Sequence, residues 1–76
     1  MEFKIVGIER KVGEYQGRNY DNTVFHCTYK KEHMEEGEAV SSIKIKTDRI
    51  DEPLQVGDVV SFYYDQYGNV LQVNIM

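Results

Sequence analysis

The sequence lacks most of the features that identify a secreted or membrane-embedded protein. It holds one cysteine, Cys27, so an intramolecular disulfide is impossible, and its N-terminal residues do not form a signal-peptide pattern. It also lacks an apolar run long enough to cross a membrane. We therefore expect a cytoplasmic protein whose partners do not include a membrane.

The sequence also lacks the periodicity of apolar residues that is typical of helices. No long window places apolar residues three and four positions apart, which is the spacing that a buried helix face needs. No linker, repeat or low-complexity run divides the 76 residues, so we expect one domain over residues 1–76. A chain this short builds only a small core, and dimerisation would add to its stability.

Strand patterns occupy most of the chain. Alternation and β-branched or aromatic residues predict five strands, over residues 3–12, 23–31, 39–48, 58–65 and 69–76. Gly7 inside the first strand indicates a bulge or bend. We expect three phenylalanines and the alternating apolar residues of the strands to face the core: Phe3, Ile5, Phe25, Ile43, Ile45, Phe62, Leu71, Val73 and Ile75.

Four connections join these strands, over residues 13–22, 32–38, 49–58 and 66–69. The first is interpreted as a polar loop, the second is acidic, and the last is a tight hairpin in which Gly68 can adopt a positive φ. Five strands in a chain of this size fit an all-β fold. The natural candidate is a small five-stranded OB-type barrel with a protruding hairpin.

Residues for catalysis or metal binding are also scarce. His26 and Cys27 are neighbours on a strand, so their side chains point to opposite faces and do not form a nucleophile–base pair. Together with His33 they lack the spaced pairs of a zinc site, and the glutamates of residues 32–38 lack the register of a calcium loop. We expect no enzymatic activity, no cofactor and no small-molecule substrate.

Charge is distributed unevenly along the chain. The net charge is −4, but residues 1–31 carry +2 and residues 32–76 carry −6. Such asymmetry indicates a partner surface, or it is random variation of surface charge. On the first interpretation, the basic part meets phosphates and the acidic part repels nucleic acid, which keeps a bound strand on one face.

Three tyrosines fall outside the predicted strands: Tyr15 and Tyr20 in the first connection, and Tyr67 at the hairpin tip. Bases of single-stranded nucleic acid stack on such rings, at about 1–3 kcal/mol per base. The cations near these tyrosines, Arg10, Lys11 and Arg18, are suited to phosphates, and the outward Lys44 and Lys46 offer a second basic row. The alternative is that these tyrosines pack on the barrel or fill a protein–protein interface, where tyrosine is also favoured.

The run from Gln16 to Tyr20, with Cys27 seven residues later, resembles the DNA-binding loop of the gene V single-stranded-DNA-binding proteins of filamentous phages. That family has Gln-Gly-basic-x-Tyr there, with a cysteine at the same distance. Arg10 falls on a basic DNA-contacting position of the family, and Lys44 is similar to a lysine that contacts the DNA backbone. Residues 66–69 resemble its Gln-Phe-Gly-Ser hairpin, whose aromatic ring stacks on DNA bound mainly by the partner subunit.

The chain departs from the family at several positions. The family places tyrosine directly after its cysteine, whereas here Thr28 follows and Tyr29 comes one residue later. Asn22 stands at an apolar position, Tyr15 stands at a basic one, and the acidic loop 32–38 has no counterpart. These differences predict weaker binding than in the phage proteins, with a shallower dependence on salt.

The resemblance implies a homodimer that binds single-stranded DNA with little sequence preference, in the replication or transfer of a phage or mobile element. Phosphates would be contacted by Arg10, Arg18 and Lys44, and bases would stack on Tyr15, Tyr20 and Tyr67. The alternative function is a non-catalytic protein–protein interaction barrel.

Overall fold

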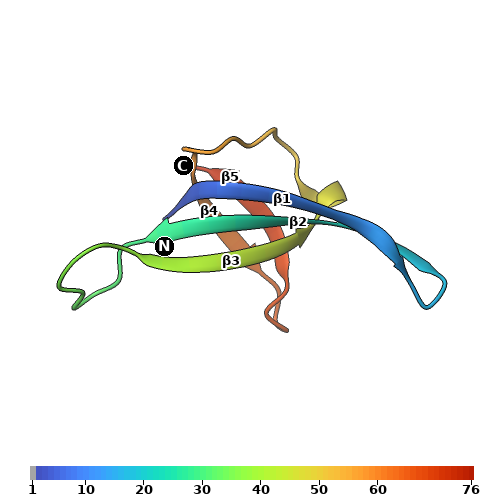
Figure 1. The fold of residues 1–76 in the computed structure, drawn as a ribbon, viewed down its shortest axis with the longest axis horizontal. Helices are drawn as coiled ribbons and strands as arrows, with labels where there is room; N and C mark the ends of the chain where they lie inside the picture. Colours follow the sequence, from blue (N-terminus) through green and yellow to red (C-terminus); the bar gives the residue numbers. More distant parts are fainter. Residues whose placement is uncertain (1) are drawn as a thin grey trace.

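The computed structural model describes residues 2–76, which form one antiparallel sheet of five strands (Figure 1). The strands are β1 (Phe3–Tyr15), β2 (Arg18–Tyr29), β3 (Ala39–Lys46), β4 (Val59–Tyr64) and β5 (Val70–Ile75). A single 3-10 turn, η1 (Thr47–Arg49), follows β3. The predicted all-β class is confirmed, and the predicted bounds of the last three strands agree to within two residues.

The strand order in the sheet is β3-β2-β1-β4-β5, so β3 and β5 are its two edges. β4 and β5 run across the direction of β1, β2 and β3 in Figure 1, because the sheet bends back over itself. This bend brings Cα atoms of β3 within 8 Å of Cα atoms of β5. Among residues 2–76, no helix is long and apolar enough to cross a membrane.

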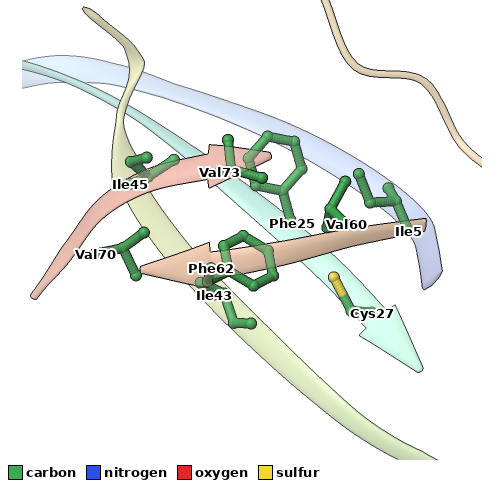
Figure 2. Packing of buried hydrophobic residues seen from close by; sticks show 9 residues of the cluster. All are labelled: Ile5, Phe25, Cys27, Ile43, Ile45, Val60, Phe62, Val70 and Val73. Carbon is green, nitrogen blue, oxygen red and sulfur yellow. The ribbon is translucent and has the colours of Figure 1, made fainter. Parts of the chain in front are cut away.

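The core lies between β4–β5 and the other three strands, and every strand contributes to it (Figure 2). Its members are Ile5, Phe25, Cys27, Ile43, Ile45, Val60, Phe62, Val70 and Val73. Phe25 is 1% exposed, and its ring centroid lies 6.2 Å from that of Phe62. Burial raises the pKa of the Cys27 thiol, as expected for a cysteine that serves as a small apolar residue.

The first connection differs from its prediction. Residues 13–22 are not a loop: β1 and β2 continue through them as a paired hairpin, and only Gln16 and Gly17 form the turn. Both turn residues have positive φ, 50° and 75°, as a type I′ turn requires. Residues 9–22, which we call the arm, extend away from the core (Figure 1).

Two irregularities change which side chains face the core. The register of β1 against β2 shifts between Ile5 and Gly7, which confirms the bulge predicted at Gly7. A second shift, between Tyr63 and Tyr64, inserts an extra residue into β5, so Val70 and Val73 are buried and Leu71 is 44% exposed. The prediction of Leu71 as a core residue is therefore wrong. Ile75, at the end of the edge strand, is also 45% exposed rather than buried.

Candidate nucleic-acid interface

Strand pairing sorts the side chains of the arm onto two sides. Residues directly opposite each other in antiparallel strands project to the same side of the sheet. One side, which we call the outer face, begins on the arm and continues onto β3. It carries Glu9, Lys11, Gly13, Tyr15, Arg18, Tyr20, Asn22, Val24, His26, Ser42, Lys44 and Lys46.

A groove of about 730 Å³ lies between this outer face and the β4–β5 hairpin. Its lining includes three cations, Lys44, Lys46 and Arg49, and two tyrosines, Tyr20 and Tyr64. No aspartate or glutamate is among the described residues that line it. The three cations favour anions within the groove, whereas the adjoining hollow, which shares Tyr20, Asn22 and Lys46 with it, is also lined by Asp21 and Asp48.

The groove collects cations from the acidic part of the chain. Lys44, Lys46 and Arg49 are the only lysines and arginines of residues 32–76, and all three line it. β3 pairs with β2, so these cations come to lie beside Tyr20 from the basic part. The division of charge along the sequence therefore does not correspond to two faces of the molecule.

Tyr20 packs across the strand pair against the backbone of Gly13. A Cβ atom added to Gly13 would lie 2.4 Å from the Tyr20 Oη and 2.6 Å from its Cζ, so only glycine leaves room for the ring. Tyr20 nevertheless remains 42% exposed and lines the groove. The contact with Gly13 therefore restricts the orientation of the Tyr20 ring, while part of the ring surface remains accessible to a ligand.

Gly13→Ala will displace the Tyr20 ring while leaving the fold intact, because the ring is the mobile end of a side chain. If Tyr20 stacks on a base, the affinity for oligo-dT falls about threefold to tenfold, a part of the usual stacking free energy. The NMR shifts of the Tyr20 ring protons report the displacement of the ring, and fluorescence anisotropy with labelled oligo-dT measures the affinity. Asn19→Ala, at an exposed position that projects to the other side of the arm, is the control. Equal affinities for the two variants would contradict the role of Tyr20.

The tips of the two hairpins carry the other predicted aromatic residues. Tyr15 is 70% exposed and pairs with Arg18 next to the arm turn, and Tyr67 is 79% exposed at the β4–β5 turn. The Asp65 carboxylate accepts hydrogen bonds from the backbone amides of Tyr67 (2.8 Å) and Asn69 (2.9 Å). The bonds from Asn69 and Tyr67 hold the pKa of Asp65 below its usual value. The predicted positive φ of Gly68 is confirmed at 84°.

Arg10 lies on the opposite side of the arm from Tyr20 and Arg18, because it pairs with Thr23. Its Nη2 and Nε donate to the Asp21 carboxylate, at 2.5 Å and 3.0 Å. Thr47 Oγ1 donates to the same carboxylate at 2.7 Å, which connects the base of the arm to η1. The structure therefore places Arg10 in an ion pair and does not bring it together with the other predicted site residues.

Asp21→Asn will make folding less sensitive to acid. The hydrogen bonds from Arg10 and Thr47 lower the pKa of Asp21 from its usual 3.8 to about 2. A carboxylate with a lowered pKa stabilises the fold above its unfolded pKa and loses that contribution as the pH falls through its folded pKa. Urea unfolding at about pH 5 and about pH 2.5 should therefore show a smaller loss of stability for the variant than for the wild type. Asp51→Asn, at an exposed position, is the control and should lose as much stability on acidification as the wild type. If Asp21→Asn also loses as much stability as the wild type, the stabilising role of the Asp21 carboxylate is contradicted.

Sequence reasoning missed a hydrogen-bonded chain across β1, β2 and β3. His26 Nδ1 lies 2.8 Å from Ser42 Oγ, and His26 Nε2 forms a short hydrogen bond with Glu9 Oε1. The bond from His26 lowers the pKa of Glu9. Because Ser42 also lines the groove, this chain connects the groove to a titratable side chain.

Two further groove residues were not predicted, Arg49 and Tyr64. Arg49 follows β3 in η1, and its Nη1 donates to the carbonyl oxygen of Val70 at 3.4 Å. Tyr64 ends β4 and is 51% exposed. Nothing in the local sequence indicates that η1 and the β4–β5 hairpin meet, so only the tertiary structure identifies these two residues.

Comparisons with family models, curated proteins and solved structures found no match to this chain. Within residues 2–76, no group of three or more histidine, cysteine, aspartate or glutamate side chains is placed to hold a metal ion. The groove, the arm and the motifs of the sequence are therefore the features that indicate a function.

Proposed function

We propose that the protein binds single-stranded DNA in the groove and along the outer face of the arm. One observation carries the proposal: three cations, two tyrosines and no carboxylate line one groove of a chain whose net charge is −4. Cations hold phosphates and tyrosine rings stack on bases, and together they bind a single strand with little sequence preference.

The path of the strand follows from the placement of these side chains. Lys44, Lys46 and Arg49 contact phosphates in the groove, where Tyr20 and Tyr64 offer rings to bases. Beyond Tyr20, the outer face adds Arg18 and Tyr15 towards the arm tip, and Tyr67 adds a ring at the other hairpin. In this proposal Arg10 does not contact phosphate, because its ion pair with Asp21 stabilises the arm instead.

Single strands fit this surface better than a duplex. Stacking on tyrosine needs a base whose face is free, and bases in a duplex already stack on their neighbours. Duplex-reading proteins usually insert a helix or strand pair into the major groove to reach base edges. The exposed tyrosines favour contacts with unstacked bases instead.

We also propose that the bent sheet is an OB-type barrel. Its two edge strands, β3 and β5, approach each other, as closure of a barrel requires. OB folds bind oligonucleotides on the face of their second and third strands and with the loops that follow their first and fourth strands. The groove and the two hairpins of this protein lie in those positions.

The homodimer and the biological setting are proposals that rest on the resemblance to the gene V proteins. A dimer is further supported by two exposed apolar residues of β1, Ile8 (39%) and Val12 (66%), which project to the side opposite the outer face. Sedimentation equilibrium tests it, with an expected mass of twice 8.9 kDa. The resemblance places the protein in the replication or transfer of a phage or mobile element.

Titration of labelled oligo-dT, followed by fluorescence anisotropy at low salt, tests the proposed function. We expect saturable binding that weakens as salt rises, with a logarithmic slope of about −0.7 for each phosphate contacted, and weaker binding of a duplex of equal length. Absence of binding at high micromolar protein would overturn the proposal. It would favour the alternative, in which the tyrosines form a protein–protein interface.

A further inference from the structure

We propose that His26 and Ser42 form a proton-linked phosphate site at the groove. When His26 is protonated, the Ser42 hydroxyl is released to donate a hydrogen bond to a bound phosphate. The inference rests on the proposed function, since the phosphate belongs to the single-stranded DNA in the groove. It adds Ser42 as a residue that contacts the DNA, and it couples DNA binding to the protonation of His26.

The geometry of the chain defines the site. His26 of β2 lies directly opposite Ser42 of β3, and its Nδ1 is 2.8 Å from Ser42 Oγ. On the other side, its Nε2 is bonded to Glu9 Oε1 of β1. Ser42 lines the groove two residues before Lys44, on the same side of β3.

The protonation state of His26 decides what the serine hydroxyl does. In the neutral ring, Nε2–H donates to Glu9 and Nδ1 accepts, so the Ser42 hydroxyl donates its only hydrogen to His26. In the imidazolium ion both ring nitrogens are donors, so Nδ1–H donates to Ser42 Oγ. The Ser42 hydrogen is then free for a phosphate oxygen. One proton leaves a solvent hydronium ion and forms the Nδ1–H bond, and no other covalent bond changes.

The charged groups around His26 make this equilibrium sensitive to a ligand. On its side of the sheet lie Lys4, Glu9 and Lys11 from β1 and Lys44 and Lys46 from β3. Glu9 accepts a hydrogen bond from His26 in both states, and its negative charge partly offsets the positive charge of these lysines. A phosphate beside Ser42 adds negative charge and therefore favours the imidazolium ion. By linkage, proton uptake strengthens phosphate binding by the same factor.

Affinity for labelled oligo-dT at about pH 8 and about pH 6, at constant ionic strength, tests the site within the range where histidines titrate. For the wild type we expect binding to be about fivefold tighter at the lower pH, the low end of typical coupling. His26→Gln and Ser42→Ala should each remove most of this difference. His33→Gln is the matched control, because His33 is the other histidine and is 95% exposed in the acidic loop.

The outcomes separate this inference from the proposed function. Equal wild-type affinities at the two pH values, or an unchanged pH dependence in both His26→Gln and Ser42→Ala, would overturn the inference while DNA binding stands. Loss of the pH dependence in His33→Gln would show that His33, and not His26, causes it. That result would also overturn the inference. If His26→Gln does not fold, Ser42→Ala decides. No binding at either pH would overturn the proposed function itself.

Discussion

Replacing Lys44 and Lys46 together with glutamate will weaken the binding of oligo-dT by about 100-fold or more at low salt. Hydrogen bonds to charged groups contribute about 1.5–3 kcal/mol each, and each 1.4 kcal/mol changes an affinity about tenfold. Both lysines line the groove beside Tyr20, so the substitution removes two phosphate contacts and adds two repulsive charges there. Anisotropy titration at several salt concentrations should also show a shallower salt slope.

The matched control is the replacement of Lys30 and Lys31 with glutamate. These two lysines are exposed beyond the end of β2 and outside the groove, and their reversal changes the net charge by the same amount. The control should retain most of the wild-type affinity, because exposed charges beyond about 10 Å are largely screened at 0.1 M salt. Equal losses in the two variants would mean that overall charge, and not the groove, governs binding.

Phe25→Ala will lower the free energy of unfolding by about 3–5 kcal/mol, the usual cost of truncating a buried phenylalanine. Phe25 is 1% exposed, packs against Phe62 and belongs to a core that all five strands share. In a chain of about this length a single core rarely contributes more than about 3–5 kcal/mol of net stability, so this change leaves much of the chain unfolded.

Urea unfolding followed by circular dichroism measures that loss. Tyr63→Ala is the control, because Tyr63 is 56% exposed on neighbouring β4, and we expect it to cost no more than about 0.5–1 kcal/mol. If Phe25→Ala cost no more than Tyr63→Ala, the sheet would not close over Phe25 as described. Binding by Phe25→Ala should fall only in proportion to the unfolded fraction, since Phe25 does not line the groove.

Strand positions were predictable wherever one side of a strand is buried. Ile43 and Ile45 alternate with exposed Lys44 and Lys46, so both the strand and its inward side could be predicted from the sequence. Alternation fails at Leu71, because the extra residue opposite Tyr63 and Tyr64 reverses which side chains face inward. No residue near Leu71 signals that bulge.

The arm could not be predicted for a different reason. It extends beyond the core, so both of its sides meet solvent and neither needs a regular set of apolar residues. Its turn also uses Gln16, rather than the more usual asparagine or aspartate, at the first position with positive φ. A polar segment with a glycine therefore has the sequence pattern of a loop.

The candidate site was predictable in part. Tyr20, Arg18 and Lys44, chosen from the sequence, do lie on one face. Only the strand pairing of the arm shows that Arg10 projects away from the other predicted site residues, because neighbouring strand residues such as Arg10 and Lys11 point to opposite sides. Arg49 and Tyr64 join the groove only because the bent sheet brings η1 and the β4–β5 hairpin together.

The most direct test of the groove as the DNA site is an amide NMR titration of the wild-type protein with unlabelled oligo-dT. We expect the largest shift changes at the groove, over residues 42–46, Arg49 and residues 68–70, together with Tyr20 of the arm. Residues 32–38 of the acidic loop should change little, since they lie outside the groove. Changes confined to other surfaces, with the groove amides unmoved at saturation, would contradict the account.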